Sequence, residues 1–213
     1  MGSESQAVKR RYDSSRRQER ARRSRDRILD EAEEAFLSTG YGATSIGAIA
    51  AAAGVSVDTI YKSYGGKPGL IRALRTRALR GQEPLPAETR SDRIQQFESD
   101  PHRIIEAWGQ FLAELAPRGG RIQLLVRDAI GTHPELRGLL QEMDDARLRR
   151  MTENARRLHK AGHLRRDVGV ADAALILWTY SSPEVYELLV LRRGLSLADY
   201  ASFVSEAMAA ALL

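Results

Sequence analysis

Residues 44–64, which read TSIGAIAAAAGVSVDTIYKSY, contain the signals that decide the fold. Thr44 or Ser45 is expected to cap a short helix that runs through the alanines, whose small side chains let a neighbouring helix approach closely. Gly54 ends this helix and allows a sharp turn. Ser56 then opens a second short helix that reaches the end of the stretch. The stretch therefore predicts two short helices joined by a tight turn.

Such a pair is typical of a helix-turn-helix, in which the second helix lies in the major groove of DNA. Ile46, Ile49 and Ile60 supply the apolar contact that would fix the crossing of the two helices. An ordinary pair of antiparallel helices in a bundle has the same spacing. The stretch alone leaves both interpretations open.

Further helices are expected on both sides of this pair. Before it, Ser24 is a candidate N-cap for a helix that ends near Gly40. The apolar residues of that helix share one face: Ile28, Leu29, Ala32, Ala35 and Phe36. After the pair, Gly65 and Gly66 interrupt the pattern, and a fourth helix is expected over residues 69–80. We therefore expect a small helical module over residues 24–80.

The rest of the chain predicts a second helical module. Residues 81–100 are rich in Pro, Glu, Ser and Asp and lack apolar periodicity, so they are interpreted as a loop or linker. Amphipathic helical segments follow at 104–115, 122–130, 136–160, 171–180, 183–193 and 197–212. No strand alternation occurs, so the expected fold class is all-α. The expected domains are a flexible basic arm at 1–23, the module at 24–80, and a helical bundle at 81–213. Alternatively, the continuous Arg/Glu pattern of the arm could extend the first helix backward.

The charge is concentrated at the N-terminus. The 213 residues carry a formal net charge of +5, and residues 1–27 contain ten basic and four acidic side chains, so the rest is close to neutral. A basic segment on a neutral body suggests a polyanion such as nucleic acid as partner, although a solubilising tail has the same composition. No apolar run approaches the roughly 20 residues of a membrane span, and no secretory leader is recognisable. We expect a cytoplasmic protein without membrane contact.

No motif indicates catalysis. The chain has no cysteine, which excludes disulfides, thiolate nucleophiles and cysteine-ligated metals. It has no dinucleotide-binding glycine pattern, phosphate loop or nucleophile elbow. His159 and His163 stand four residues apart, but Gly162 lies between them and surface histidines are the simpler interpretation. We expect no enzyme, no metal and no cofactor. The alternative function is a helical small-molecule-binding protein or enzyme with only non-specific affinity for nucleic acid.

The order and spacing of residues over about 24–72 resemble the DNA-binding domain of the tetracycline-repressor (TetR) family. The matching residues are Ile28-Leu29-Asp30-Glu31-Ala32, Phe36, Gly40-Tyr41, Thr44-Ser45-Ile46, Ile49-Ala50, Ala53-Gly54-Val55-Ser56, Thr59-Ile60-Tyr61, Gly65, Lys67 and Leu70. The resemblance implies a three-helix DNA-binding domain, a connecting fourth helix, and a larger ligand-binding and dimerisation domain. It also implies a homodimer that reads a roughly palindromic operator. Ser63-Tyr64 departs from the His-Phe that family members often have here.

The matched positions suggest two groups of DNA-binding residues. Contacts to the sugar-phosphate backbone are expected from Thr44, Ser45, Tyr61, Tyr64 and Lys67. Base edges are expected to be read by Ser56, Val57, Asp58, Thr59 and Lys62. Asp58 has a second interpretation as a first-turn helix charge.

The resemblance also implies an effector site and a dimer interface in the C-terminal bundle. The effector, a small molecule of unidentified class, is expected to meet Trp108, Phe111, Arg127, Met143, Trp178 and Tyr180, although the aromatic residues would also suit a plain core. The expected dimer interface comprises Val185, Leu188, Leu189, Leu191, Tyr200, Phe203, Val204, Ala207, Met208 and Ala211, which would equally suit an intramolecular core face. The predicted function is a sequence-specific transcriptional regulator, a repressor that a ligand releases from its operator.

Overall fold

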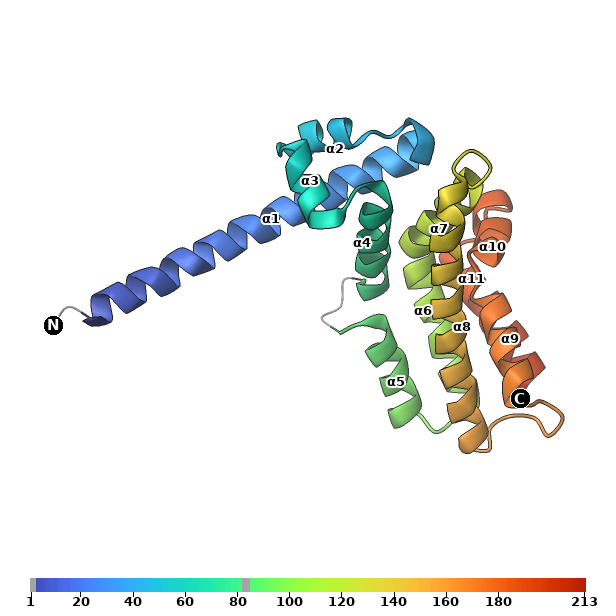
Figure 1. The fold of residues 1–213 in the computed structure, drawn as a ribbon. Helices are drawn as coiled ribbons and strands as arrows, with labels where there is room; N and C mark the ends of the chain where they lie inside the picture. The colour runs from blue at the N-terminus through green and yellow to red at the C-terminus, as the bar shows by residue number, and fades with distance from the viewer. Residues whose placement is uncertain (1–2, 82–84) are drawn as a thin grey trace. The chain divides into compact units, whose positions relative to one another are not determined.

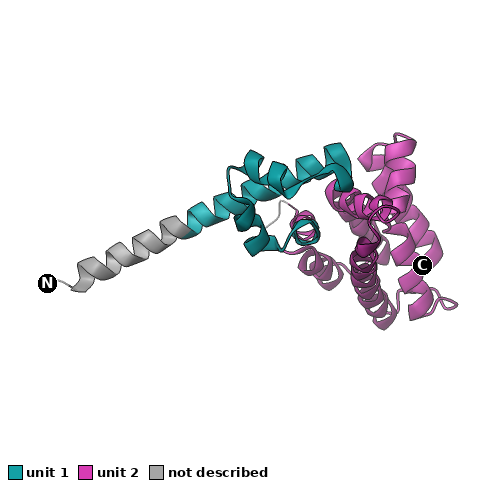
Figure 2. Cartoon of the chain, turned by 45° about the horizontal axis from the view of Figure 1, so that its top comes forward, with its two compact units in different colours: residues 1–73 teal, residues 74–213 magenta. Residues whose placement is uncertain are grey.

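The computed structural model describes residues 3–81 and 85–213, with side chains from residue 18 onward in those ranges. The described residues form helices and turns without strands, which confirms the all-α prediction (Figure 1). The chain divides into two compact units, residues 1–73 (unit 1) and residues 74–213 (unit 2), shown in Figure 2. The division falls inside one helix, α4 (Lys67–Arg80), which therefore contributes to both units.

Helix α1 of unit 1 begins much earlier than the sequence predicted. It spans Ser3–Ala43, so Ser24 lies inside the helix and is not its N-cap. No glycine or proline occurs between Ser3 and Gly40, and Glu19 pairs with Arg23 one turn later at 3.0 Å, which favours a continuous helix. The expected break at Gly40 is found, since φ is 86° there. The side chains of residues 1–17 lie outside the described set, so the flexible arm stays a prediction.

The two short helices form as predicted. Helix α2 spans Ile46–Ala53 and α3 spans Val57–Tyr64. Their N-caps are Ser45 and Ser56, and Gly54 ends α2 in the left-handed conformation with φ of 64°. The core of unit 1 collects apolar side chains from all four helices: Ile28, Ala32, Phe36, Ile46, Ile49, Ile60, Leu70 and Ile71. The three isoleucines expected to fix the helix crossing are therefore buried.

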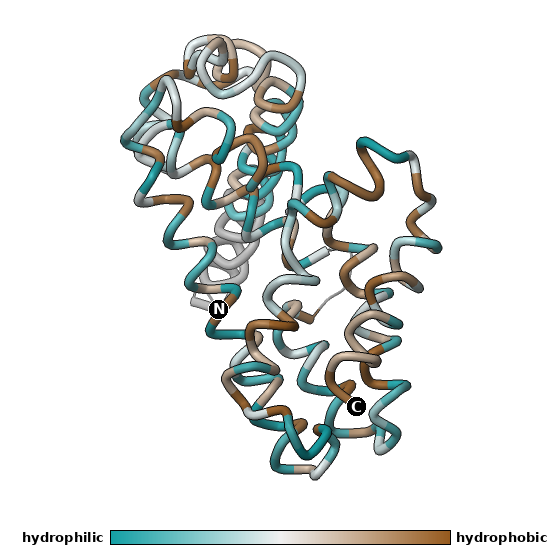
Figure 3. Tube along the Cα trace, turned by 90° about the vertical axis from the view of Figure 1, so that its right-hand side faces the viewer, coloured by the Kyte–Doolittle hydropathy of each residue, from teal (hydrophilic) through white to brown (hydrophobic). Residues whose placement is uncertain are grey.

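Unit 2 is a bundle of helices joined by short turns. Its elements after α4 are α5 (Ala87–Phe97), α6 (Pro101–Leu115), a π-helical turn (Ala116–Gly120), α7 (Arg121–Ala129), a 3₁₀ turn (Pro134–Leu136), α8 (Arg137–Lys160), α9 (Val170–Tyr180), α10 (Pro183–Tyr186), a second π-helical turn (Glu187–Arg192) and α11 (Leu197–Leu212). Helix α6 packs against α11, and α8 packs against α9. Apolar residues recur along these helices (Figure 3) and meet in a core that includes Ile105, Leu158, Leu177 and Met208.

The interpretation of residues 81–100 as a linker is wrong, because this segment contains α5. Ile94 packs this helix against the apolar core, and ion pairs attach it further. Arg90 pairs with Glu114 at 2.8 and 2.9 Å, and Asp92 accepts a hydrogen bond from Arg150 at 2.6 Å. Apolar periodicity does not reveal a helix that is held in this way.

None of the described helices has the length and hydropathy that crossing a bilayer requires.

Gly69 provides a sensitive test of the packing in unit 1. A Cβ atom at this position would lie 1.6 Å from the backbone oxygen of Tyr64, which a side-chain movement cannot relieve. At Gly47, in the same unit, an added Cβ would meet only the Ser45 hydroxyl at 3.9 Å. We expect Gly69→Ala to lower the free energy of unfolding by about 3 kcal/mol or more, and Gly47→Ala to leave it unchanged or raise it by up to about 1 kcal/mol. Urea unfolding followed by circular dichroism measures both, and equal effects would contradict this account.

Candidate functional site

One face of α3 is directed away from the core of unit 1. Ile60 is buried on the inner side, whereas Val57 and Tyr61 are 41% and 53% exposed although both are largely apolar. Asp58 and Lys62 are also exposed, and neither forms an ion pair with a described side chain. These four residues stand at i, i+1, i+4 and i+5, so they share one side of the helix. The face offers an apolar group, a phenol, a carboxylate and an ammonium group to a partner.

The hydroxyl groups predicted to contact DNA also build the helix starts. Ser56 accepts a hydrogen bond from the backbone N–H of Thr59 at 3.2 Å, and the two side-chain oxygens lie 2.8 Å apart. Ser45 caps α2 by accepting from the N–H of Ala48 at 3.1 Å. Ser45 and Ser56 remain exposed, and Thr59 is half-buried. The caps therefore fix where the surface hydroxyls stand.

Thr44 has a different role from the one predicted. Its side chain is buried, with 4% exposure, and its hydroxyl lies 2.7 Å from the Gly40 carbonyl oxygen, 3.1 Å from that of Ala35 and 2.9 Å from the Thr39 hydroxyl. A hydroxyl engaged in this way cannot also reach a phosphate. We therefore correct the assignment of Thr44 from phosphate contact to internal support.

Lys67 is also part of the internal framework. Its ammonium group donates hydrogen bonds to the carbonyl oxygens of Tyr41 at 2.7 Å and Thr44 at 3.1 Å, and it lies 4.2 Å from the centre of the Tyr41 ring. These contacts tie α4 to the junction between α1 and α2. The predicted phosphate contact of Lys67 stays a prediction beside this internal role. Tyr64 is half-buried, which leaves Tyr61 as the more accessible of the two predicted tyrosines.

The described part of α1 adds positive charge to unit 1. Arg20, Arg22, Arg23, Arg25 and Arg27 are all exposed. Arg22 and Arg23 share Glu19, and their hydrogen bonds hold the pKa of that carboxyl below its usual value. The other three arginines form no ion pair with a described side chain, so their charges are available to a polyanion.

Unit 2 contains a cavity of about 410 Å³. Trp108 and Phe111, both predicted to meet an effector, line it. The other apolar groups of its wall include Leu79, Leu112, Leu115, Met151, Leu177 and Met208. Its polar groups include Arg75, Gln123, Arg147, Arg150 and Asn154. None of these five polar residues was predicted from the sequence to bind an effector.

Four residues predicted to bind an effector lie elsewhere. Met143 is buried in the core, and Tyr180 packs against the core cluster of α6, α8, α9 and α11. The Trp178 ring lies 4.4 Å below the guanidinium group of Arg147. Arg127 pairs with Asp128 and Glu187, each at 2.8 Å. Hydrogen bonds from Arg127 and then from Arg192 lower the pKa of Glu187 to about 2, so this cluster is an ion-pair network and not part of the cavity wall.

The predicted dimer interface is divided between the core and the surface. Tyr200, Val204 and Met208 are buried inside unit 2, because α11 directs this face toward α6, so they are not available to a second subunit. Burial raises the pKa of Tyr200 to about 12. Leu188 and Phe203 are 53% and 48% exposed, and Leu191, three residues after Leu188 and also expected at the interface, is 49% exposed. The remaining predicted residues are half-buried: Val185, Leu189, Ala207 and Ala211.

Comparison with known proteins identifies unit 1. Residues 28–74 match the model of the bacterial regulatory proteins of the tetR family, a segment that contains α2, α3 and the start of α4. Residues 28–74 therefore carry a DNA-binding domain of the TetR type. The helix-turn-helix predicted from the sequence lies in this segment, and the match supports a DNA-binding regulator. No curated protein matched the chain.

Solved TetR-family structures share the fold over most of the chain. NalD, the secondary repressor of the MexAB-OprM multidrug efflux pump in Pseudomonas aeruginosa, is 23% identical with a TM-score of 0.67, covering 92% of this chain and 98% of NalD. The regulator FadR from Bacillus subtilis, solved with stearoyl-CoA, is 18% identical with a TM-score of 0.69. The match covers 88% of this chain and 98% of FadR. PfmR from Thermus thermophilus is 22% identical with a TM-score of 0.59. The match covers 89% of this chain and 97% of PfmR. At these identities the likeness concerns the fold.

The internal role of Lys67 can be separated from a surface role. We expect Lys67→Met to lower the free energy of unfolding by about 1–3 kcal/mol, because two carbonyl oxygens lose their donor. Lys62→Met removes the same charge from the exposed face of α3, so its effect on stability should stay within about 0.5 kcal/mol. Urea unfolding measures both variants. A neutral Lys67→Met, or an equal loss from Lys62→Met, would contradict the assignment.

Proposed function

We propose that the protein represses transcription as a homodimer on a roughly palindromic operator, and that a small molecule in the cavity of unit 2 releases it. The observation that carries this proposal is the exposed face of α3, which stands at the start of the second helix of a TetR-type helix-turn-helix. The same unit is basic, because the described part of α1 carries five exposed arginines.

The exposed residues of α3 suit the edges of base pairs. The Val57 side chain would contact the methyl group of thymine, Lys62 would donate to guanine, and Asp58 would accept from the amino group of cytosine. Tyr61 would contact the sugar-phosphate backbone together with Ser45 and the N-terminus of α2. Ser56 and Thr59 hold the start of α3, from which their hydroxyls would approach the groove.

A palindromic operator requires two copies of α3 related by a two-fold axis. Apolar side chains near the end of unit 2 support a self-complementary interface. Leu188, Leu191 and Phe203 are about half exposed and come from the segment 187–192 and from α11. Ala207 and Ala211 lie one and two turns after Phe203, and such small residues allow helices to pack closely.

The cavity supports the regulatory half of the proposal. Pockets of this size and apolar character hold small molecules, and FadR was solved with stearoyl-CoA. Arg75 and Leu79 of α4 line the cavity, and the same helix begins in unit 1 at Lys67. A ligand would change DNA affinity by binding one arrangement of α4 more tightly than another. We place this regulator in the cytoplasm, with the DNA that it binds.

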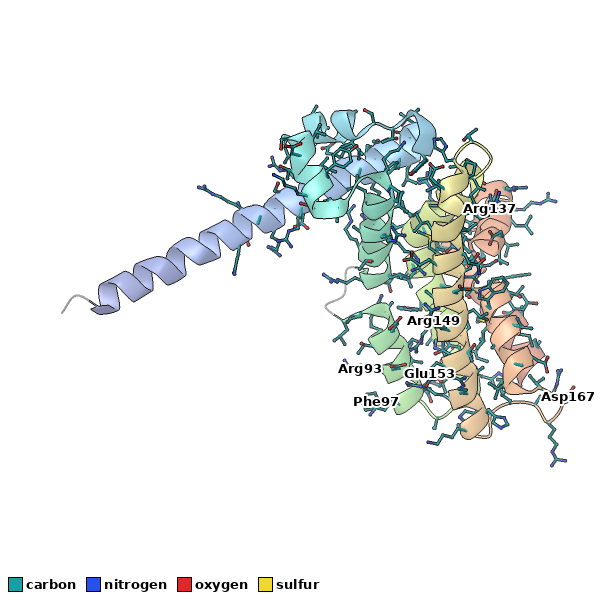
Figure 4. The ribbon with its side chains drawn as sticks, viewed as in Figure 1. Arg93, Phe97, Arg137, Arg149, Glu153 and Asp167 are labelled. Carbon is teal, nitrogen blue, oxygen red and sulfur yellow. The ribbon has the colours of Figure 1, made fainter. Side chains whose placement is uncertain are left out.

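Selection from a pool of random duplex DNA tests operator recognition. We expect the wild-type protein to enrich a palindromic sequence. On the selected site, Lys62→Met should weaken binding by about 1–3 kcal/mol, because a base contact is lost. Arg149→Met removes a charge from an exposed position of α8 (Figure 4) and should bind as tightly as wild type. Binding without an enriched sequence, weakening equally with salt for every variant, would reduce the protein to a non-specific polyanion binder.

The dimer interface can be tested with two matched substitutions. We expect Phe203→Glu to convert the dimer to a monomer and to abolish tight operator binding, because a carboxylate would be buried between subunits. Phe97, near the end of α5 (Figure 4), is 75% exposed and lies outside the proposed interface, so Phe97→Glu should leave the dimer intact. Analytical ultracentrifugation gives the mass of each variant. A dimeric Phe203→Glu protein would contradict the proposed interface.

A further inference from the structure

The polar part of the cavity wall in unit 2 carries an excess of positive charge. Four arginines line the cavity: Arg75, Arg80, Arg147 and Arg150. Glu88 is the one carboxylate among the described lining residues, and it is exposed, as is Arg80. The charge that matters inside the cavity is therefore that of the three less exposed arginines.

Two of these three have carboxylate partners. Arg147 donates to Asp144 at 3.1 Å, to the carbonyl of Trp178 and to the Ser181 hydroxyl at 3.4 Å. Arg150 donates to Asp92 at 2.6 Å. Asp92 also pairs with Arg157 at 3.1 Å. Each of these two cavity arginines therefore already contacts a carboxylate of the protein.

Arg75 has no such partner. Its guanidinium group donates to the backbone carbonyl of Met143 at 3.1 Å, and within the described residues it forms no ion pair with a carboxylate. Burial lowers the pKa of Arg75, and Glu142 opposes this effect by attraction at longer range. An arginine remains protonated at neutral pH in spite of such a shift. A half-buried cation without a contacting counter-ion therefore faces the cavity.

The rest of the cavity wall is mainly apolar, with the side chains of Leu79, Phe111, Leu115 and Met151 among its members. A partly buried cation is costly until an anion pairs with it, and the apolar surface favours hydrocarbon. A ligand with one acidic group and an apolar body would satisfy these requirements together.

We propose that this cavity binds an amphipathic carboxylate, with the carboxylate on the guanidinium group of Arg75 and the hydrocarbon body against the apolar wall. A planar carboxylate matches the two parallel N–H groups of a guanidinium. A single unpaired guanidinium balances one negative charge, which favours a carboxylate over a doubly charged phosphate group. The inference rests on the proposed function, in which the same cavity is the effector site.

Decanoate and decan-1-ol provide matched probes, since they share the hydrocarbon chain and differ in charge. We expect the wild-type full-length protein to bind decanoate at least about tenfold more tightly than decan-1-ol at neutral pH, measured by calorimetry. Arg75→Met should abolish this preference and keep the affinity for decan-1-ol. Arg149→Met, which removes a charge from the surface of unit 2, should keep the preference.

Three results would overturn the inference: no binding of decanoate, equal binding of both probes by the wild-type protein, or an unchanged preference in Arg75→Met. The second result uses only the wild-type protein, so the test does not depend on the folding of a variant. Operator binding with and without decanoate separates this inference from the proposed function. If decanoate binds through Arg75 but leaves operator affinity unchanged, the ligand class stands and the proposed release is wrong. If the protein selects no operator, the proposed repressor fails while the calorimetric result still decides the ligand class.

Discussion

The ammonium group of Lys67 holds the junction on which the position of the recognition helix depends. It donates to the carbonyl oxygens of Tyr41 and Thr44, between which the chain leaves α1 and turns toward α2. Carbonyl groups at the end of a helix lack partners within that helix, so an outside donor is valuable there. The Thr44 hydroxyl closes the same turn by bonding to Gly40. Because α2 begins two residues later and packs against α3, the direction of the exposed side chains of α3 follows from this junction.

Unit 2 combines a conventional apolar core with a cavity bordered by long polar side chains. Helix α5 is joined to its neighbours by Arg90 with Glu114, and by Asp92 with Arg150. Of these four residues only Arg150 lines the cavity, so one ion pair connects the attachment of α5 to the cavity wall.

The sequence predicted those features of the fold that depend on neighbouring residues. Ser45, Ser56 and Gly54 set the limits of α2 and α3 through their own backbone preferences, and these helices formed where expected. Other features depend on residues far apart in the chain. The predicted N-cap at Ser24 was wrong. A serine side chain can cap a helix, but here the helix continues on the N-terminal side of Ser24. Apolar periodicity identified the inner face of α11 but could not tell whether Tyr200 packs within the subunit or across a dimer.

Two arginines of the cavity did leave a signal in the sequence. Ile71, Arg75 and Leu79 recur every fourth residue, as do Met143, Arg147 and Met151, so each arginine interrupts an apolar helix face. A charge in such a position is either paired or directed at a ligand, and only the structure separates Arg147, which meets Asp144, from Arg75. Arg75 and Lys67 lie on the same helix, eight residues or about 12 Å apart along its axis. In the proposed mechanism, an anion bound to Arg75 would act on the same helix that carries Lys67.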